Sequence, residues 1–329
     1  MKKERNFHPI SEPELKEILG FDPVEKLGQN FLVDPNVVRT VAASTIQGAD
    51  VVEIGSGPGN ITKGIAARAN NVIGLEIFPG FAEAQKIILA DCPNARIINQ
   101  NALKFDFSKW LNLDREARHQ VIGNIPFNIS EPLLTILAGV SDKIEQITLL
   151  VGGNMASIMA TTDPRDDRYS RLSFIFELFD INRVTHVPRT CFWPVPRTDA
   201  DVISIVPKEY PEDGRMFGFQ LKRRIVLSQQ ENLTIAKVLN GFCIGVEGGK
   251  TLGKDLSHRF DRRQSKRELA RVVAELNRMP AGRREFCDTN PRLNSLISRI
   301  QLPEEILSKP FGRLNNDEVR RLAIAINRF

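Results

Sequence analysis

The stretch VVEIGSGPGNITKG, residues 51–64, contains the feature that decides the fold. An apolar run is followed directly by three glycines, Gly55, Gly57 and Gly59, and then by a segment with the composition of a helix. Glycines at this spacing allow a tight turn and let a ligand approach the backbone, because no Cβ atoms stand in the way. The spacing is Gly-x-Gly-x-Gly, which differs from the Gly-x-Gly-x-x-Gly of dinucleotide-binding proteins. The stretch therefore predicts a strand, a ligand-binding turn and a helix.

Two acidic residues accompany the glycines. Glu53 lies two residues before Gly55, and Glu76 ends the next apolar run, VIGLEI, 21 residues after Gly55. An acid at the end of the second strand is placed to accept hydrogen bonds from ribose hydroxyls. We therefore predict a site for a nucleoside-type cofactor, although a glycine turn beside a surface acid is the alternative. S-adenosylmethionine is favoured over NAD because it has no pyrophosphate that would require an anion-binding helix N-terminus.

The arrangement of apolar segments predicts two domains. Short apolar runs alternate with amphipathic segments in the first part of the chain, which indicates an α/β domain with a mainly parallel sheet. With the glycine turn, this pattern predicts a Rossmann-like α/β domain over residues 1–207, with an N-terminal extension over 1–24. Residues 206–216, VPKEYPEDGRM, are rich in Pro, Gly and charge, as is typical of a domain boundary. A smaller helical domain is predicted over 208–329, with Asn316 as the candidate N-cap of its last helix.

A second motif is VIGNIPFNISEPL, residues 121–133. It closes an apolar run, which predicts that Asn124 lies at the carboxyl end of a strand, where open α/β sheets bind ligands. Pro126 offers a carbonyl without an N–H, and Phe127 offers a flat face on which a base can stack, worth about 1–3 kcal/mol. The Asn124 carbonyl and a neighbouring backbone carbonyl can accept both hydrogens of an adenine N6 amine and favour a pyramidal nitrogen, so that positioning supports an in-line transfer. The alternative is a proline turn beside a core phenylalanine.

The overall composition narrows the class of protein. The chain of 329 residues exceeds the usual size of one core, and its formal charge of +5 permits an anionic partner without proving one. The four cysteines and four histidines form no Cys-x-x-Cys pair and no cluster, so we expect no structural metal and a reducing compartment. No apolar run reaches the roughly 18–20 residues that span a bilayer. Residues 1–19 contain four glutamates and show no secretory-signal pattern, so we expect a cytoplasmic monomer, with the mitochondrial matrix as the alternative location.

Together the motifs resemble those of the rRNA adenine N6-dimethyltransferase family, which includes the KsgA-type ribosomal enzymes, the Erm resistance methylases and the mitochondrial transcription factor B branch. EKLGQNFLVD (25–34) is similar to the family's opening signature, EIGSGPGNIT (53–62) to its glycine motif and GNIPFNISEPL (123–133) to its catalytic Asn-Leu-Pro-Tyr motif. The likeness runs over residues 15–207 and more weakly to the C-terminus. It implies that residues 1–207 form a Rossmann-like S-adenosylmethionine-dependent methyltransferase domain and that S-adenosyl-L-methionine is the cofactor. The cofactor-binding residues that it implies are Gln29, Asn30, Leu32, Gly55, Gly57, Gly59, Glu76, Asn101 and Asn124, and the catalytic residues are Asn124, Pro126 and Phe127.

Several positions depart from the family's pattern. Asn101 stands where the family has an Asp that accepts a hydrogen bond from the cofactor's adenine amine, and an amide oxygen accepts without the stronger charge-assisted bond, so we expect weaker cofactor binding. Phe127 replaces the commoner Tyr but stacks equally well. Residues 149–160 lack the usual Gln-Lys-Glu, and Glu231 and Asn232 stand where relatives tend to be basic. These departures together predict reduced or lost turnover.

The most basic segment runs from Arg259 to Arg284 and contains nine Lys and Arg residues but only three acidic residues. Counterion release would make such a segment a phosphate-binding surface with salt-dependent affinity, whereas the alternative is a solvated helix face. The family resemblance implies that this helical domain helps to dock on RNA. The candidate RNA-binding residues are Arg259, Arg262, Arg263, Lys266 and Arg267.

Three functions remain open from the sequence. The resemblance favours an enzyme that dimethylates N6 of adenines in small-subunit ribosomal RNA during maturation of the small ribosomal subunit. A non-catalytic or weakly catalytic RNA- or DNA-binding factor for ribosome assembly or mitochondrial transcription is the first alternative, favoured by Asn101 and the altered segment 149–160. An Erm-like methylase acting on large-subunit RNA is the second alternative.

Overall fold

A computed structural model describes most of the first two thirds of the chain and part of its C-terminal end. The described residues are 7–24, 28–114, 117–125, 127–152, 155, 158, 159, 161–208, 221, 222, 225, 226, 235, 238 and 302–327. The chain divides into two compact units, Met1–Tyr210 and Pro211–Phe329. The predicted boundary after residue 207 lies close to this division, and the roles assigned to the two domains stay predictions. Among the described residues, no helix has both the length and the apolar character needed to cross a membrane.

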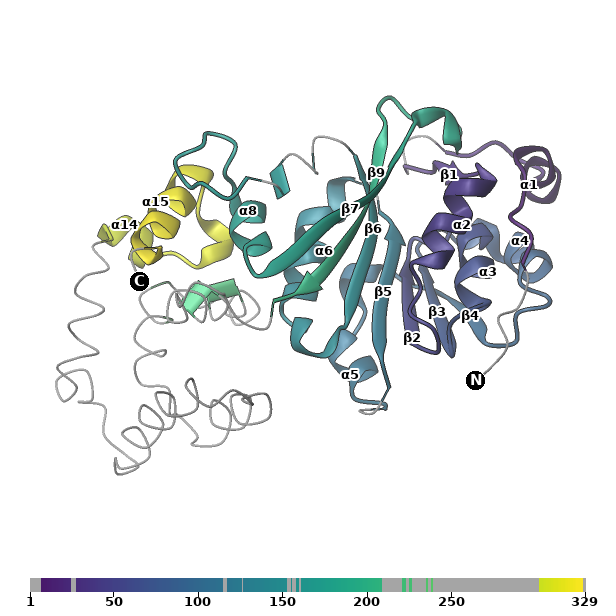
Figure 1. Cartoon of the computed structure of the whole chain (residues 1–329), viewed down its shortest axis with the longest axis horizontal. Coiled ribbons are helices and arrows are strands. Elements are labelled where there is room, and N and C mark those ends of the chain that lie inside the picture. The colour runs from purple at the N-terminus through teal and green to yellow at the C-terminus, as the bar shows by residue number, and fades with distance from the viewer. Residues whose placement is uncertain are drawn as a thin grey trace. The chain divides into compact units, whose positions relative to one another are not determined.

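Unit 1 is built on a seven-stranded mixed sheet in the order β4-β3-β2-β5-β6-β9-β7 (Figure 1). The pairings among β4, β3, β2, β5 and β6 are parallel, whereas β9 pairs antiparallel with both β6 and β7. This confirms the predicted α/β, Rossmann-like fold. The strands, in sheet order, are β4 (Ala95–Asn99), β3 (Asn71–Glu76), β2 (Asp50–Ile54), β5 (His119–Asn124), β6 (Gln146–Gly152), β9 (Ala200–Pro207) and β7 (Phe179–Val187).

Helices cover both faces of this sheet, with α2 and α3 in front of it and α6 behind it in Figure 1. In the central strands both faces are apolar, because successive residues point to opposite faces and both are buried, as Val51 and Val52 of β2 show. The helices of unit 1 are α1 (Glu12–Leu19), α2 (Pro35–Ala43), α3 (Asn60–Ala66), η2 (Pro79–Phe81), α4 (Ala82–Ile88), η3 (Ala102–Lys104), α5 (Phe107–Leu111), α6 (Phe127–Ala138), η4 (Ser141–Lys143), α8 (Arg171–Phe176) and η5 (Arg189–Cys191).

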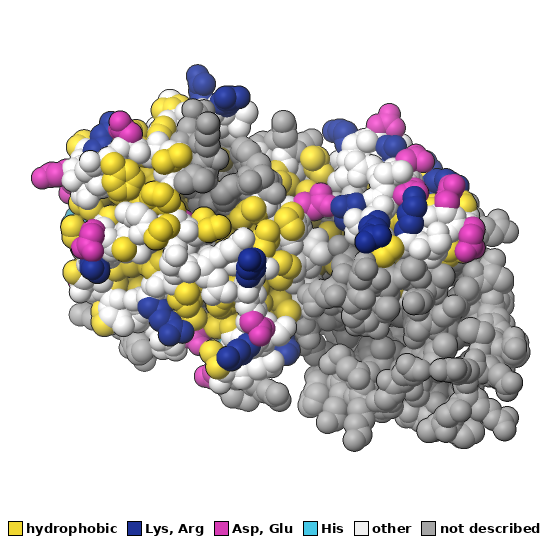
Figure 2. All heavy atoms as spheres, turned by 180° about the vertical axis from the view of Figure 1, so that it is seen from behind, with side chains coloured by type: hydrophobic (Ala, Val, Ile, Leu, Met, Phe, Trp, Pro, Cys, Tyr) yellow, Lys and Arg dark blue, Asp and Glu magenta, His cyan; other side chains and the backbone are white. Residues whose placement is uncertain are grey.

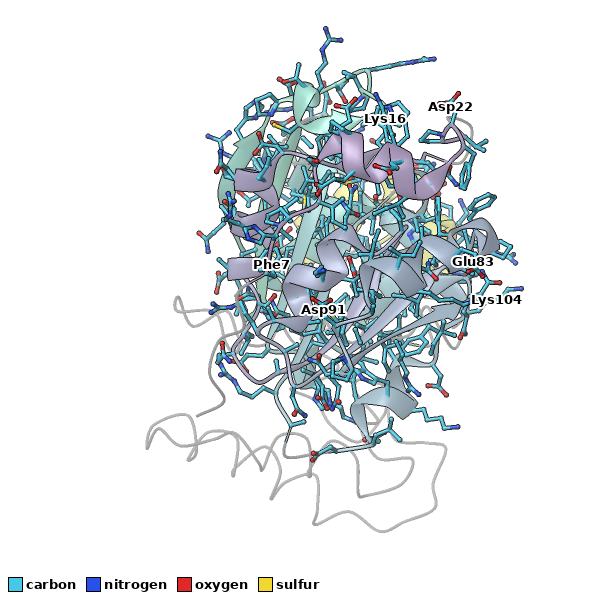
Figure 3. All side chains as sticks on the ribbon, turned by 90° about the vertical axis from the view of Figure 1, so that its right-hand side faces the viewer. Phe7, Lys16, Asp22, Glu83, Asp91 and Lys104 are labelled. Atoms are coloured by element: carbon cyan, nitrogen blue, oxygen red, sulfur yellow. The ribbon has the colours of Figure 1, made fainter. Side chains whose placement is uncertain are left out.

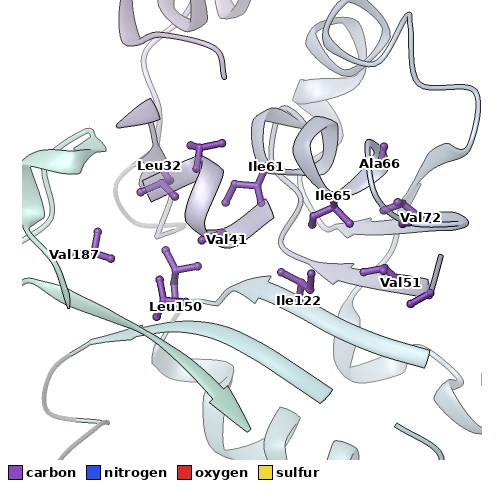
Figure 4. Packing of buried hydrophobic residues seen from close by; sticks show 14 of the residues in the cluster. Leu32, Val41, Val51, Ile61, Ile65, Ala66, Val72, Ile122, Leu150 and Val187 are labelled. Carbon is purple, nitrogen blue, oxygen red and sulfur yellow. The ribbon is translucent and has the colours of Figure 1, made fainter. Parts of the chain in front are cut away.

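The core on the α2 and α3 side fixes the position of the glycine turn. Val41 of α2 and Ile65 of α3 are fully buried in one cluster with Val51 and Ile122 of neighbouring strands (Figure 4). Burying an aliphatic side chain of this size stabilises the fold by about 1.5–3 kcal/mol. The packing therefore anchors α3 directly behind the turn that precedes it.

A second, two-stranded sheet joins the N-terminal region to a segment far along the chain. Strand β1 (Phe31–Leu32) pairs antiparallel with β8 (Phe192–Trp193), and the N–H groups of Val33 and Asp34 donate to the Cys191 carbonyl at 2.9 and 3.2 Å. The carboxylate of Asp34 then caps α2, where it accepts from two backbone N–H groups of the first turn. The residues around β1 are therefore held on both sides.

The predicted N-terminal extension is ordered and packed in the part that the structure describes, residues 7–24. Leu15 and Leu19 of α1 are buried against Phe31 and Phe81, and the Lys16 ammonium lies 5.1 Å from the centre of the Trp193 ring (Figure 3). Phe7 lies so close to α3 that a Cβ added at Gly64 would be 2.8 Å from its ring. The extension is thus part of the packing of unit 1.

In unit 2 the structure describes α14 (Glu304–Leu307), η7 (Phe311–Arg313) and α15 (Asn316–Ile326). The N-cap of α15 is Asn315, whose side chain accepts from the Glu318 N–H at 2.9 Å while the Glu318 carboxylate accepts from the Asn315 N–H at 2.9 Å. The prediction of Asn316 as the cap was wrong by one residue, because a capping box needs its acid three positions after the cap. The predicted helix at 265–276 lies outside the described residues.

Candidate active site

The turn after β2 has the conformation that its glycines predict. Gly55, Gly57 and Gly59 have φ angles of 69°, 54° and 102°, all in the left-handed region that disfavours other residues. The N–H groups of Gly55 and Ser56 donate to the Leu75 carbonyl of β3 at 2.9 and 3.2 Å. The turn is therefore tied to the end of the neighbouring strand.

The turn also lies against the second motif. Strands β2 and β5 are parallel and in register, with Ile54 opposite Gly123. A Cβ added at Gly55 would be 3.2 Å from the Asn124 carbonyl oxygen, and a Cβ at Gly57 would be 3.2 Å from the Phe31 ring. The glycine turn, the end of β5 and strand β1 thus meet at one edge of the sheet.

Glu76 ends β3 beside this turn. Its Oε2 accepts a hydrogen bond from the Gly57 N–H, and its Oε1 accepts one from the Phe78 N–H, both at 2.8 Å. Burial raises the pKa of Glu76, and the bonds from these backbone N–H groups act against the rise. Each carboxylate oxygen can accept a second hydrogen bond, so Glu76 retains acceptors of the kind that ribose hydroxyls need.

The segment around β1 brings the three residues of the opening signature to the same edge. Gln29 accepts from the Val24 N–H through Oε1 at 2.7 Å, whereas its buried Nε2 has no hydrogen-bond partner among the described residues. The Asn30 carbonyl accepts from Asn124 Nδ2 at 2.9 Å. The Leu32 carbonyl accepts from Asn60 Nδ2, so this segment is bound to both motifs.

Asn101 directly precedes η3, two residues after the end of β4. Its Oδ1 accepts a hydrogen bond from the Leu103 N–H at 2.9 Å and so caps the short helix. On the adjoining strand end, Asn99 Nδ2 donates to the carbonyls of Glu76 and Ile77, both at 3.0 Å. Ile77 leaves 63% of its surface exposed beside Glu76. The exposed side chain of Ile77 and the polar side chains of Asn99 and Asn101 therefore adjoin the predicted ribose site.

Other predicted residues are described only in part or not at all. Phe127 begins α6, while its side chain and the whole of Pro126 lie outside the described residues. The five candidate RNA-binding residues, Arg259, Arg262, Arg263, Lys266 and Arg267, also lie outside the described residues. Their roles stay predictions.

Two contributors to this site were not singled out from the sequence. Asn60, the first residue of α3, holds the Leu32 carbonyl, and Phe31 of β1 closes one side of the glycine turn. Asn60 follows the third glycine directly, and Phe31 lies inside the opening signature. Position within a motif was therefore the signal that could have found them.

A hollow of about 460 Å³ in unit 1 lies at the opposite, amino edge of β2, β3 and β4. Its lining includes Asp50, Asn70, Asn71 and Trp110, and the Asn70 and Asn71 amides donate to Asp50 at 3.0 and 2.9 Å. Because ligands of open α/β sheets bind at the carboxyl ends of the strands, this hollow does not belong to the candidate site.

The described residues fit the predicted cofactor. A turn with glycine at three of its five positions, residues 55–59, lets a nucleoside approach the backbone, and Glu76 has acceptors for the nucleoside hydroxyls. Gln29 has a buried amide nitrogen whose hydrogen-bonding capacity is not used by the described residues. The Asn124 side chain offers an amide oxygen at the adjoining strand end. This donor and acceptor set suits a nucleoside linked to an amino acid.

Comparison with known proteins identifies similar chains. A family model described as "Ribosomal RNA adenine dimethylase" matches residues 22–239. The probable ribosomal RNA small subunit methyltransferase A of Methanopyrus kandleri is 33% identical over 201 residues, which cover 60% of this chain and 69% of the relative. The ribosomal RNA small subunit methyltransferase A of Moorella thermoacetica is 32% identical over 237 residues, covering 66% of this chain and 82% of the relative. A dimethyladenosine transferase structure from Plasmodium falciparum aligns with a TM-score of 0.49 at 20% identity, over 91% of this chain and 98% of the other.

Proposed function

Because the chain belongs to the ribosomal RNA adenine dimethylase family, we propose that it transfers methyl groups from S-adenosyl-L-methionine to N6 of adenines in small-subunit ribosomal RNA. Membership confirms the resemblance drawn from the sequence motifs. The observation that carries the proposal is the proximity of the two motifs, since a Cβ at Gly55 would be 3.2 Å from the Asn124 carbonyl oxygen. A cofactor on the glycine turn and an amine at Asn124 would therefore be neighbours.

The cofactor would be held by residues of β1, β2 and β3. The backbone of the glycine turn would lie against the cofactor. Glu76 would accept hydrogen bonds from the cofactor's ribose hydroxyls, and Gln29 would donate one to the cofactor through its buried Nε2. Asn30, Leu32 and Asn101 complete the proposed set. When bound, S-adenosylmethionine supplies a methyl group on a positively charged sulfur. The residues of this chain hold and orient it.

The adenine would be held at the end of β5. The side-chain oxygen of Asn124 and the main-chain carbonyl that follows it accept the two N–H groups of the amine, and Phe127 stacks on the base. This arrangement favours the amine geometry in which the nitrogen lone pair is free to react. Catalysis then depends on positioning more than on a general base.

The names of the curated relatives support an enzyme acting on the small subunit. Those relatives are named ribosomal RNA small subunit methyltransferase A, which favours neither a non-catalytic factor nor an Erm-like enzyme. We propose that residues 208–329 form the RNA-binding domain and that the substrate is the immature small subunit. A monomer in the cytoplasm remains part of the proposal, with the mitochondrial matrix as the alternative location.

The proposal is tested by incubating the purified chain with immature small subunits and methyl-labelled S-adenosylmethionine, followed by mapping of modified adenines. Wild type is expected to label N6 of small-subunit adenines. Asn124→Ala removes the side-chain acceptor for the substrate amine. Because a misplacement of about 1 Å can cost about 100-fold in rate, we expect the rate of methyl transfer to fall by about this factor. Cofactor affinity, measured by calorimetry, is expected to fall much less than the rate.

A matched control is Asn112→Ala, which changes an exposed asparagine at the end of α5 and should leave the rate unchanged. A wild-type chain that binds the cofactor and RNA but labels no adenine would support the non-catalytic alternative. Label confined to large-subunit RNA would support the Erm-like alternative.

A further inference from the structure

The side-chain amide of Asn124 has one orientation that its surroundings allow. Its Nδ2 donates to the main-chain carbonyl of Asn30 at 2.9 Å, although the two residues are 94 positions apart. The reverse orientation would place Oδ1 against that carbonyl oxygen, so that two acceptors would face each other without a proton. The Asn30 carbonyl therefore decides which end of the Asn124 amide is left for a ligand.

The Asn30 carbonyl is itself held in place from several directions. The Asn30 N–H donates to the Gly28 carbonyl at 3.0 Å, and the next two residues form β1, paired with β8. The carbonyl of Leu32 accepts from Asn60 of α3. The carbonyl that accepts from Asn124 therefore belongs to a segment that is held by the β1–β8 sheet and by α3.

We propose that the main-chain carbonyl of Asn30 positions Asn124, directing its Oδ1 toward the substrate amine, and that the site for this reason requires an amide and not a carboxylate at position 124. Asn30 is then a positioning residue that acts through its backbone. The inference rests on the proposed function for the identity of the amine, while the orientation itself can be tested without cofactor or RNA.

Asn101 is a matched control in which the side-chain hydrogen bond has the opposite direction. Both asparagines are half-buried near the carboxyl ends of strands, but Asn101 accepts through Oδ1 from the Leu103 N–H, whereas Asn124 donates through Nδ2 to a carbonyl. An aspartate at 101 would keep its hydrogen bond as a carboxylate. An aspartate at 124 would have a carboxylate facing a carbonyl oxygen and would keep its hydrogen bond only when protonated.

The test measures the free energy of unfolding from pH 4 to pH 8 for wild type, Asn124→Asp and Asn101→Asp. A carboxyl facing an acceptor has a pKa above the ordinary aspartate value of about 3.9, and we expect a rise of at least about one unit in Asn124→Asp. Because the folded pKa is raised, stability is present at low pH and is lost as pH rises through the raised value. Each unit corresponds to a tenfold loss in the folding equilibrium constant relative to wild type.

Asn101→Asp should behave differently in the same range. Its carboxylate accepts from an N–H group, which lowers its pKa, so its stability relative to wild type should stay constant above about pH 5. Two carboxyl groups lie on the neighbouring strands, Glu53 on β2 and Glu76 on β3. The pKa of Glu53 is raised to about 8 by burial, so this group carries little charge over the tested range, and Glu76 would raise the aspartate pKa in both variants wherever it is ionised. A pH-independent difference in Asn124→Asp, or equal profiles for the two variants, would overturn the proposal.

A second measurement uses the wild-type chain and so does not depend on a variant that folds. In protein labelled with ¹⁵N-asparagine, one of the two Nδ2 protons of Asn124 should exchange with solvent at least about tenfold more slowly than the side-chain amide protons of exposed Asn36, whose side chain accepts from Arg39 through Oδ1. Equal exchange of both protons at the exposed rate contradicts the orientation. Protected exchange in a chain that transfers no methyl groups would leave the orientation standing and reject the proposed function alone.

Discussion

Glu53, on β2, is buried two residues before the glycine turn and accepts a hydrogen bond from the Thr62 hydroxyl of α3. Burial raises the pKa of its carboxyl to about 8, the Thr62 bond acts against this rise, and the charge of Glu76 adds to it. Glu53 is therefore mostly protonated at neutral pH. It joins β2 to α3 as a neutral acid beside the turn.

Replacing this acid should change how stability depends on pH. The pKa of Glu53 in the folded protein, near 8, lies above its ordinary value of 4.5. The contribution of this group to the free energy of unfolding is therefore fully present below pH 4.5 and is lost as pH rises through 8. Glu53→Gln keeps an acceptor for Thr62 and removes the ionisation. Urea unfolding at pH 5, 6.5 and 8 should show wild type losing up to about 1.4 kcal/mol per pH unit relative to the variant. Parallel profiles for the two proteins would contradict the raised pKa.

At the scale of elements, the glycine turn combines two constraints at Gly57. Its φ of 54° disfavours a side chain, and a Cβ there would be 3.2 Å from the Phe31 ring of β1. We expect Gly57→Ala to lose about 1–2 kcal/mol of stability from the left-handed backbone alone. The variant should also bind S-adenosylmethionine more weakly, because Phe31 and the turn must move apart. Thermal unfolding and calorimetry measure the two effects.

Gly48→Ala separates the backbone effect from the crowding against Phe31. Gly48 has a φ of 76°, yet an added Cβ would meet nothing within 4 Å. This variant should lose a similar amount of stability while its cofactor affinity stays at the wild-type value. Equal losses of cofactor affinity in both variants would show that Gly57 affects binding only through global stability.

At the scale of the whole molecule, the two units differ in how densely Lys and Arg residues follow one another along the sequence. On the face of unit 1 shown in Figure 2, Lys and Arg side chains of the described residues are scattered among hydrophobic and uncharged ones, and several lie beside Asp or Glu. The densest basic segment of the sequence runs from Arg259 to Arg284 in unit 2. RNA binding through the phosphate backbone is therefore expected to depend on unit 2.

This expectation is tested by neutralising Arg262, Arg263, Lys266 and Arg267 together with Gln. RNA affinity should fall, and the plot of log affinity against log salt should become shallower by up to about 0.7–0.9 for each phosphate that the variant no longer neutralises. The control changes four exposed basic residues of unit 1, namely Lys86, Lys104, Lys109 and Arg165. Filter binding between about 50 and 200 mM salt, a range over which phosphate binding weakens strongly, measures both sets. An unchanged slope in the unit 2 variant would assign RNA binding elsewhere.

Much of the fold could be predicted because it depends on local patterns. Alternating apolar runs predict strands and helices, three glycines predict a left-handed turn, and the acid after the next run predicts an acceptor at the end of β3. The same local patterns also produced an error of one residue at a helix cap. The cap of α15 is Asn315 and not Asn316, since both asparagines satisfy the composition rule and only the spacing to Glu318 distinguishes them.

The sequence by itself therefore determined the family, the fold class and the two motifs at the carboxyl ends of neighbouring strands. Only the tertiary structure decided which groups those motifs face. The Asn124 amide meets a carbonyl 94 residues away, and Glu53 becomes a neutral acid because packing removes it from water. Hydrogen-bond direction and desolvation depend on groups that approach through space, and no spacing along the chain encodes them.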